Sequence, residues 1–307
     1  MPHPTQPPAD TASAGDAAVL TYLGRFALTE PSPLRLAGED YTLHGLSVVE
    51  VAWPEDTPPG DAFDRRWKHI VAEVESESFR GTEPVDGVLV DERVVRDGLR
   101  AVLYRSGYAP DKMTWTALLR TDGGGVRFQR DTWAGDEDAD LDALRTVAEA
   151  YAPQPPPTDA GTWFHAGRGG FALPFQDREA AFARFVDGDV ELSISFQSLR
   201  EAPSRSVLQS LFEGAWGEAF DAFGGNTTSI RGETRTVAGR EGREEIFRFT
   251  EQDGLWVHFS WNAPGQARSG THPRIDIEMV APADHYDGLL PLWEQTLSSL
   301  RSLSETR

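Results

Sequence analysis

The chain has 307 residues, which is enough for two domains of the commonest size, and its 39% apolar content with nine tryptophans is ample for packed cores. Its 49 acidic and 29 basic residues give a net charge of −20, so nucleic acid and membrane surfaces are poor partners, whereas a basic protein is compatible. The absence of cysteine excludes disulfides, thiol nucleophiles and thiolate metal sites, and no apolar run is long enough to predict a membrane-spanning helix.

The N-terminal part begins with a segment that has no predicted structure. Residues 1–18 are rich in Pro, Ala, Ser, Thr and Asp, which is typical of a flexible leader, and they lack the basic start and apolar block of a signal peptide. After this leader, alternating and β-branched runs predict strands, and stripes of apolar residues predict helices. The expected strands are residues 19–28, 41–53 (one or two strands), 85–95, 99–105, 113–120 and 126–130, and the expected helices are residues 62–77 and 141–151.

A proline-rich segment, residues 153–157, predicts a semi-rigid linker. The elements expected after it are strands at residues 170–174 and 190–198, a helix at 204–223, a three-stranded antiparallel meander within 237–279 and a helix at 285–303. In the middle strand of the meander, alternation predicts one face for the core and another that can meet a partner. The core face has Leu255, Val257, Phe259 and Trp261, and the other face has Trp256, His258 and Ser260.

The second part of the chain resembles the first. Residues 96–105 align with residues 240–249 at a shift of about 144 residues, and weaker matches follow in order at nearly the same shift. The pattern predicts an α+β fold made of two tandem copies of an antiparallel β-sheet unit, each covered by two helices on one face. The expected organisation is a leader (1–18), a first domain (19–152), a linker (153–160) and a second domain (161–307).

No string in the sequence predicts catalysis, a metal or a cofactor. Residues 136–140 alternate acids as a calcium loop does, but Leu141 and Val147 stand where that loop needs Gly and Glu, so they predict a solvated loop before a helix. The seven histidines have no metal-ligand spacing, and there is no G-x-S-x-G, P-loop or G-x-G-x-x-G string. Glu244 and Glu245 are adjacent on a predicted strand, so they point to opposite faces and do not form an acid/base pair.

Four tryptophans do not all fit the predicted core stripes. They are Trp115, Trp133, Trp163 and Trp256. Exposed tryptophan and arginine side chains often anchor protein interfaces, so these residues are candidates for binding. The alternative is that they cap sheet edges or line the seam between the two domains.

Four segments of the sequence together resemble the Tli-type immunity proteins of bacterial type VI secretion systems, which neutralise phospholipase effectors. The segments are Leu23–Phe26, Gly239–Glu245, Phe259–Gly265 and Pro273–Glu278, and the likeness extends over most of residues 19–303. The resemblance implies a two-domain α+β protein without enzymatic activity, monomeric when free, that grips a cognate secreted lipase effector and blocks access to its active site. It also implies a periplasmic protein whose signal or lipoprotein anchor lies outside this sequence, with a cytoplasmic location as the alternative. No functional residue is carried over, because the matching segments look like scaffold.

A second function remains open, namely a small-ligand-binding protein or an uncatalogued hydrolase that uses the cleft between the two domains. A deep pocket with converging His, Asp or Arg would favour this reading, and a broad groove with aromatic and charged rims would favour an inhibitor. For the inhibitor, the expected effector-binding residues lie in loops that face the cleft. They are Trp133, Asp136, Glu137 and Asp138 in the first copy, and Gln266, Arg268 and His272 in the second.

Overall fold

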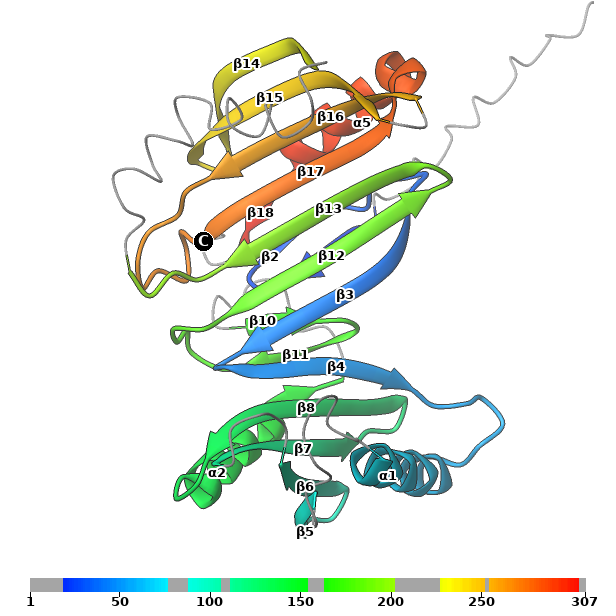
Figure 1. The fold of residues 1–307 in the computed structure, drawn as a ribbon, viewed down its shortest axis with the longest axis vertical. Coiled ribbons are helices and arrows are strands. Elements are labelled where there is room, and N and C mark those ends of the chain that lie inside the picture. The colour runs from blue at the N-terminus through cyan, green and yellow to red at the C-terminus, as the bar shows by residue number, and fades with distance from the viewer. Residues whose placement is uncertain are drawn as a thin grey trace, which may run out of the picture.

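The computed structural model describes residues 19–76, 88–105, 111–153, 163–201, 227–251 and 254–303. Its main feature is a 12-stranded sheet in which every neighbouring pair runs antiparallel, in the order β14-β15-β16-β17-β13-β12-β3-β4-β8-β7-β6-β5 (Figure 1). The strands are β3 (Arg35–Leu43), β4 (Leu46–Ala52), β5 (Leu89–Arg96), β6 (Leu99–Arg105), β7 (Lys112–Arg120), β8 (Gly124–Trp133), β12 (Ala180–Asp187), β13 (Val190–Gln197), β14 (Thr227–Val237), β15 (Arg240–Glu251), β16 (Gly254–Ala263) and β17 (Arg274–Pro282). We call the described residues up to 153 the N-terminal half and those from 163 the C-terminal half.

The two halves of the chain contribute six strands each to this sheet and meet at the β3–β12 pair, where Glu39 lies opposite Ala183. Outward from this pair, the strand order is β3-β4-β8-β7-β6-β5 on one side and β12-β13-β17-β16-β15-β14 on the other. Counted in chain order within each half, the two sequences of strands are the same. This correspondence is what a tandem duplication would produce; the duplication and its domain boundaries at residues 152 and 161 stay a prediction.

Two small three-stranded sheets lie behind the centre of the large sheet in Figure 1, and each combines strands from both halves. The first joins the hairpin β1 (Leu20–Leu23) and β2 (Phe26–Thr29) to β18 (Arg301–Ser302), near the end of the chain. The second joins the hairpin β10 (Trp163–Ala166) and β11 (Gly169–Ala172) to β9 (Tyr151–Ala152), at the end of the N-terminal half. In each small sheet, a hairpin from one half of the chain therefore pairs with a third strand from the other half.

Helices lie on opposite faces of the large sheet. On β6 and β7, α1 (Pro59–Ser76) packs against the face that carries Val102, Tyr104 and Leu118. The other face belongs to the main core, which includes α2 (Glu137–Glu149) and α5 (Tyr286–Ser299), the latter preceded by the short 3-10 helix η1 (Ala283–His285). Side chains of α1 that pack on the sheet are Phe63, Trp67, Ile70 and Val74, the apolar stripe that the sequence places on this helix.

The expectation of an α+β fold with two sheet units, each covered by two helices, is wrong. The structure is mostly β, with one 12-stranded sheet and three α-helices in the described residues. The error has a physical reason: the sequence does not predict β12, because Ala180–Asp187 contains one β-branched residue, Val186, and pairing between β12 and β3 is non-local. Once these two strands pair, the two sheets become one.

Most of the other elements are confirmed with shifted bounds. Leu99–Arg105 is a strand as predicted, whereas the strand expected at residues 19–28 is the hairpin β1–β2, because Gly24 has a φ of 57° and turns the chain. In the meander, Val257, Phe259 and Trp261 are buried as expected, but Leu255 is exposed. The opposite face of β16 also contains buried side chains, His258 and Ser260. The helix expected at residues 204–223 lies outside the described residues.

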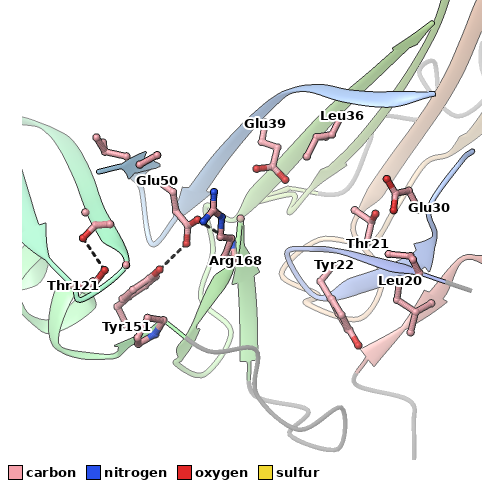
Figure 2. A pocket seen from close by; sticks show the side chains of 18 of the residues that line it. Leu20, Thr21, Tyr22, Glu30, Leu36, Glu39, Glu50, Thr121, Tyr151 and Arg168 are labelled. Carbon is pink, nitrogen blue, oxygen red and sulfur yellow. Dashed lines mark hydrogen bonds between the residues drawn. The ribbon is translucent and has the colours of Figure 1, made fainter. Parts of the chain in front are cut away.

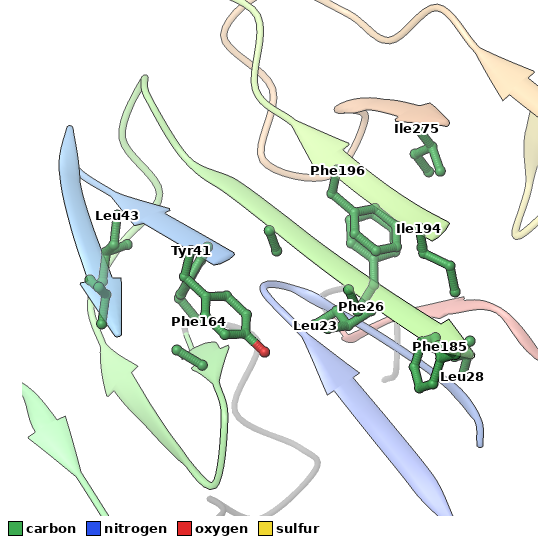
Figure 3. Packing of buried hydrophobic residues seen from close by; sticks show 14 of the residues in the cluster. Leu23, Phe26, Leu28, Tyr41, Leu43, Phe164, Phe185, Ile194, Phe196 and Ile275 are labelled. Atoms are coloured by element: carbon green, nitrogen blue, oxygen red, sulfur yellow. The ribbon is translucent and has the colours of Figure 1, made fainter. Parts of the chain in front are cut away.

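The main core is continuous across both halves (Figure 3). Phe26, on the first hairpin, stacks on Phe196 of β13 with ring centroids 4.4 Å apart, and Tyr41 of β3 meets the edge of Phe164 of β10 at 6.3 Å. Thus each hairpin packs against the large-sheet strands of the other half. No helix in the described part of the chain is long and apolar enough to cross a membrane.

Candidate functional site

The first group of predicted site residues lies where β8 ends and α2 begins. Trp133, the last residue of β8, is 53% exposed, and Asp136 takes the N-cap position of α2 without a side-chain capping bond. Glu137 accepts a hydrogen bond from the backbone N–H of Gly135 at 2.8 Å. Asp138 forms an ion pair with Arg93 at 2.7 Å. The structure therefore places an exposed aromatic ring beside an acidic helix N-terminus, whose dipole stabilises these carboxylates.

The second group lies in the connection between β16 and β17. Arg268 has a φ of 55°, a side chain that is 78% exposed, and an Nε atom 3.9 Å from Asp177. Gln266 is exposed and donates its backbone N–H to the carbonyl of His272 at 2.7 Å. This bond closes the connection into a compact loop that presents the side chains of Gln266 and Arg268 to solvent.

These two groups are not brought together. In the large sheet, β13, β12, β3 and β4 separate β17 from β8, so the two groups are about five strand spacings, or roughly 24 Å, apart. Because adjacent strands run antiparallel, the end of β8 and the start of β17 lie at the same side of the sheet, on the left in Figure 1. The arrangement provides two separate contact points on one side of the molecule.

Of the four tryptophans singled out from the sequence, Trp133 is exposed. Trp115 has no exposed surface and donates its indole N–H to the carbonyl of Glu137 at 2.9 Å, so it is a core residue that supports the start of α2. Trp163 and Trp256 are partly buried.

Two buried carboxylates, Glu179 and Glu244, hold the scaffold together. The guanidinium of Arg25, in the β1–β2 turn, binds Glu179 just before β12 through two bonds of 2.7 and 2.8 Å. Glu244, on β15, has no exposed surface, and it accepts the indole N–H of Trp293 from α5 at 2.7 Å. Arg231 and Arg235 of β14 also bind Glu244. These charged groups are buried with partners, so their role is to fasten elements together.

A cavity of about 730 Å³ opens between the first hairpin, β3, β4, the β7–β8 connection, β9 and the β10–β11 turn (Figure 2). Glu30, Glu39 and Glu50 contribute carboxylates to its lining, and Tyr22, Tyr151, Leu36 and Phe185 contribute rings and an apolar surface. Among the described residues, the lining contains no histidine, serine, cysteine or aspartate. Its hydroxyl groups belong to Thr21, Thr121, Tyr22 and Tyr151, and that of Tyr151 donates a hydrogen bond to Glu50.

Hydrogen bonds to Glu50 hold the cavity in shape. Its carboxylate accepts the hydroxyl of Tyr151 at 2.6 Å and the backbone N–H groups of Arg168 and Gly169 at 2.9 and 3.1 Å. Gly167 begins the turn with a φ of 59°, and a Cβ atom there would approach the Glu50 carboxylate to 2.5 Å, so glycine is required at this position. The carboxylate thus anchors the β10–β11 turn of the C-terminal half onto β4 of the N-terminal half.

Glu39 is the second carboxylate in the cavity that accepts a hydrogen bond. The donor is the hydroxyl of Tyr41, at 2.9 Å. Burial raises the pKa of Glu39 above its ordinary value, the Tyr41 hydrogen bond lowers it, and the charge of Glu50 raises it further. Burial also raises the pKa of Tyr41 and of Tyr151, so both phenols stay protonated and act as donors.

Sequence reasoning missed all of these cavity residues. They come from separate segments, but Glu39 is in phase with buried Tyr41 and Leu43, and Glu50 with buried Leu46 and Val48. The sequence feature that could have indicated this cavity is a glutamate at a core-facing strand position. An ionised carboxylate is costly to bury, so such a residue usually has a structural or binding role. Within the described residues, no group of three or more His, Cys, Asp or Glu could hold a metal ion.

Comparison with known proteins relates this architecture to a family. Residues 157–302 match the family described as the Tle cognate immunity protein 4 C-terminal domain. No relative was found among curated protein sequences.

Three solved structures share the fold over almost the whole chain. The immunity protein TplEi of the type VI secretion system of Pseudomonas aeruginosa, without a ligand, has a TM-score of 0.70 at 14% identity, covering 94% of this chain and 97% of that chain. A structure of the Tle4–Tli4 complex gives a TM-score of 0.71 at 14% identity, covering 94% and 98%. TplEi of P. aeruginosa complexed with "L" peptide gives 0.67 at 14% identity, again covering 94% and 98%. The family match covers residues 157–302, and the three structures, at 14% identity, show the fold that this chain shares with them.

Proposed function

We propose that this chain is an immunity protein that binds a phospholipase effector of a type VI secretion system and blocks access to the effector's active site. The observation that carries the proposal is the match of residues 157–302 to the family of Tle cognate immunity protein 4 C-terminal domains. The fold shared with the Tle4–Tli4 complex structure over 94% of the chain supports it, because the likeness extends beyond the matched residues into the N-terminal half.

The proposed mode of binding is a two-sided grip. The exposed ring of Trp133 with the acids of the α2 N-terminus forms one contact point, and the β16–β17 loop with Gln266, Arg268 and His272 forms the other. Two contacts about 24 Å apart on a rigid sheet can hold one protruding element of a partner between them, and their joint affinity exceeds that of either alone. The net charge of −20 attracts a basic partner and speeds its approach.

In this role the protein works without catalytic turnover. It acts in the periplasm, where a phospholipase delivered by a neighbouring cell meets its substrate, and it is a monomer when free.

Inhibition of a purified phospholipase tests the proposal. The cognate phospholipase effector is titrated with the protein while hydrolysis of phospholipid vesicles is followed. The expected result is loss of activity at a molar ratio near one, with a complex of the two proteins on size-exclusion chromatography. Full activity at a tenfold excess of the protein, with no complex, contradicts the proposed function. A phospholipase of an unrelated family is the control for non-specific effects on the vesicles.

A further inference from the structure

The three carboxylates that line the cavity are partly buried, and none of them forms an ion pair with a side chain of the described residues. Glu179 is paired with Arg25 at 2.7 Å, and Asp140 is paired with Arg130 at 2.7 Å. By contrast, among the described residues, no side-chain nitrogen of Lys, Arg or His lies within 4.0 Å of the carboxylates that line the cavity, Glu30, Glu39 and Glu50. Glu39 and Glu50 receive hydrogen bonds from neutral hydroxyl and N–H groups, which leave their negative charge in place.

The arrangement of the carboxylates is extended. In Figure 2, Glu50, Glu39 and Glu30 follow one another across the cavity, from β4 through β3 to the residue that follows β2. They do not converge on a common point, since no group of three or more His, Cys, Asp or Glu among the described residues could hold a metal ion. A single small cation therefore cannot meet all three charges, whereas a long molecule with several cationic groups can.

The rest of the lining suits aliphatic segments between such cationic groups. The rings of Tyr22 and Tyr151 and the apolar side chains of Leu36 and Phe185 line the same cavity. Aromatic faces attract ammonium groups and also pack against methylene chains. One cation, Arg168, lies at the cavity, but it is exposed and contacts Glu50 through its backbone N–H.

We propose that this cavity binds a linear aliphatic polyamine, with its ammonium groups paired to Glu30, Glu39 and Glu50 and its methylene segments against Tyr22 and Tyr151. The volume of about 730 Å³ lies within the roughly 300–1,000 Å³ of small-molecule sites. The site is separate from the two contact points of the proposed grip, and the inference does not depend on effector binding. It places a small-ligand site on a protein whose proposed function is to bind another protein.

Titration calorimetry of the full chain with spermidine, at physiological salt, tests the proposal. We expect one binding site and weaker binding of 1,4-diaminobutane, which has one ammonium group fewer. Glu30→Gln and Glu39→Gln should each weaken spermidine binding about fivefold, the loss of one partly exposed ion pair. Glu50 is left unchanged because it anchors the β10–β11 turn.

The matched control is Glu149→Gln, which removes one negative charge at the exposed end of α2. Equal weakening by E30Q, E39Q and E149Q would show diffuse attraction to a chain of charge −20 and would overturn the proposal. No heat with spermidine also overturns it, and if E30Q and E39Q then weaken binding of the effector, the cavity belongs to a basic segment of that protein.

A second measurement keeps the test independent of variant folding. Amide chemical shifts of the unmodified protein are recorded with and without spermidine. We expect shifts at Gly124 and Gly125, at the start of β8, and at Gly167, all in the cavity lining. Shifts confined to other acidic surfaces would overturn the assignment.

Discussion

Arg25 and Glu179 are 154 positions apart in the sequence, yet they form a two-pronged buried ion pair with Nε–Oε2 and Nη2–Oε1 distances of 2.7 and 2.8 Å. Both side chains are 6% exposed. Arg25 is in the first hairpin and Glu179 comes just before β12, so the pair fastens the start of the N-terminal half to the first large-sheet strand of the C-terminal half.

Removing one partner of this pair should be strongly destabilising. Glu179→Gln or Arg25→Met leaves a buried charge uncompensated, and we expect each to lower the free energy of unfolding by about 3–5 kcal/mol in urea denaturation. The double variant should lose less than the sum of the two single losses, because it leaves no unpaired charge. As a control, Glu191→Gln breaks the exposed pair with Arg184 and should leave the urea midpoint unchanged. If the free energy of unfolding falls by less than about 1 kcal/mol in both single variants, the buried ion pair does not stabilise the contact between the two halves.

Unfolding should be a single transition. The large sheet, both small sheets and the main core all contain residues from both halves, so neither half can unfold without exposing the other's core. We expect the urea curves from far-ultraviolet circular dichroism and from tryptophan fluorescence to coincide. Two resolved transitions would mean that the halves are independent folding units, as the sequence-based domain boundaries at residues 152 and 161 suggest.

Lowering the pH should reduce the free energy of unfolding through the protonation of His165. Its imidazole is 4% exposed and stacks on Tyr22, and burial, with a smaller contribution from the charge of Arg25, lowers its pKa to about 4. In the unfolded chain a histidine titrates near 6.5, so between about pH 6.5 and 4 the unfolded state binds the extra proton and stability falls as pH falls. The loss attributable to this residue reaches roughly 3 kcal/mol at the acid end.

Comparing stability between pH 7.5 and 4.5 in the native protein and in His165→Gln measures this contribution. The difference in free energy of unfolding between the two proteins should shrink as the pH falls. His285→Gln, at an exposed position, is the control and should keep the pH dependence of the native protein. An unchanged pH dependence in H165Q would show that His165 does not titrate as proposed.

The acidic N-terminus of α2 should govern how fast the effector is captured. Replacing Asp136, Glu137 and Asp138 by Asn, Gln and Asn should slow association severalfold and flatten its salt dependence, since exposed charges act mainly on the approach of a partner. Trp133→Ala should instead raise the dissociation rate, because a large aromatic side chain contributes through the area that it buries. Stopped-flow binding separates the two rates. Association that is equally fast at low and high salt in both proteins would exclude electrostatic capture at this N-terminus.

Local sequence patterns determined the strands whose alternation is strong and self-contained. Leu99–Arg105 and the burial of Val257, Phe259 and Trp261 followed from alternation, and the stripe of α1 followed from helical spacing, because each depends on which side chains share one face. The absence of cysteine excluded disulfides and thiolate metal sites, because this depends on residue identity alone.

Only the tertiary structure shows which strands that are distant in the sequence pair with one another. The joining of β3 to β12 merges two expected sheets into one, and the pairing of β18 with β2 and of β9 with β11 ties each half to the other. The cavity exists only because these pairings bring Glu30, Glu39, Glu50 and Tyr151 together from separate segments. Backbone hydrogen-bonding capacity is nearly the same at every residue, so a sequence shows that a strand can pair without showing which strand it pairs with.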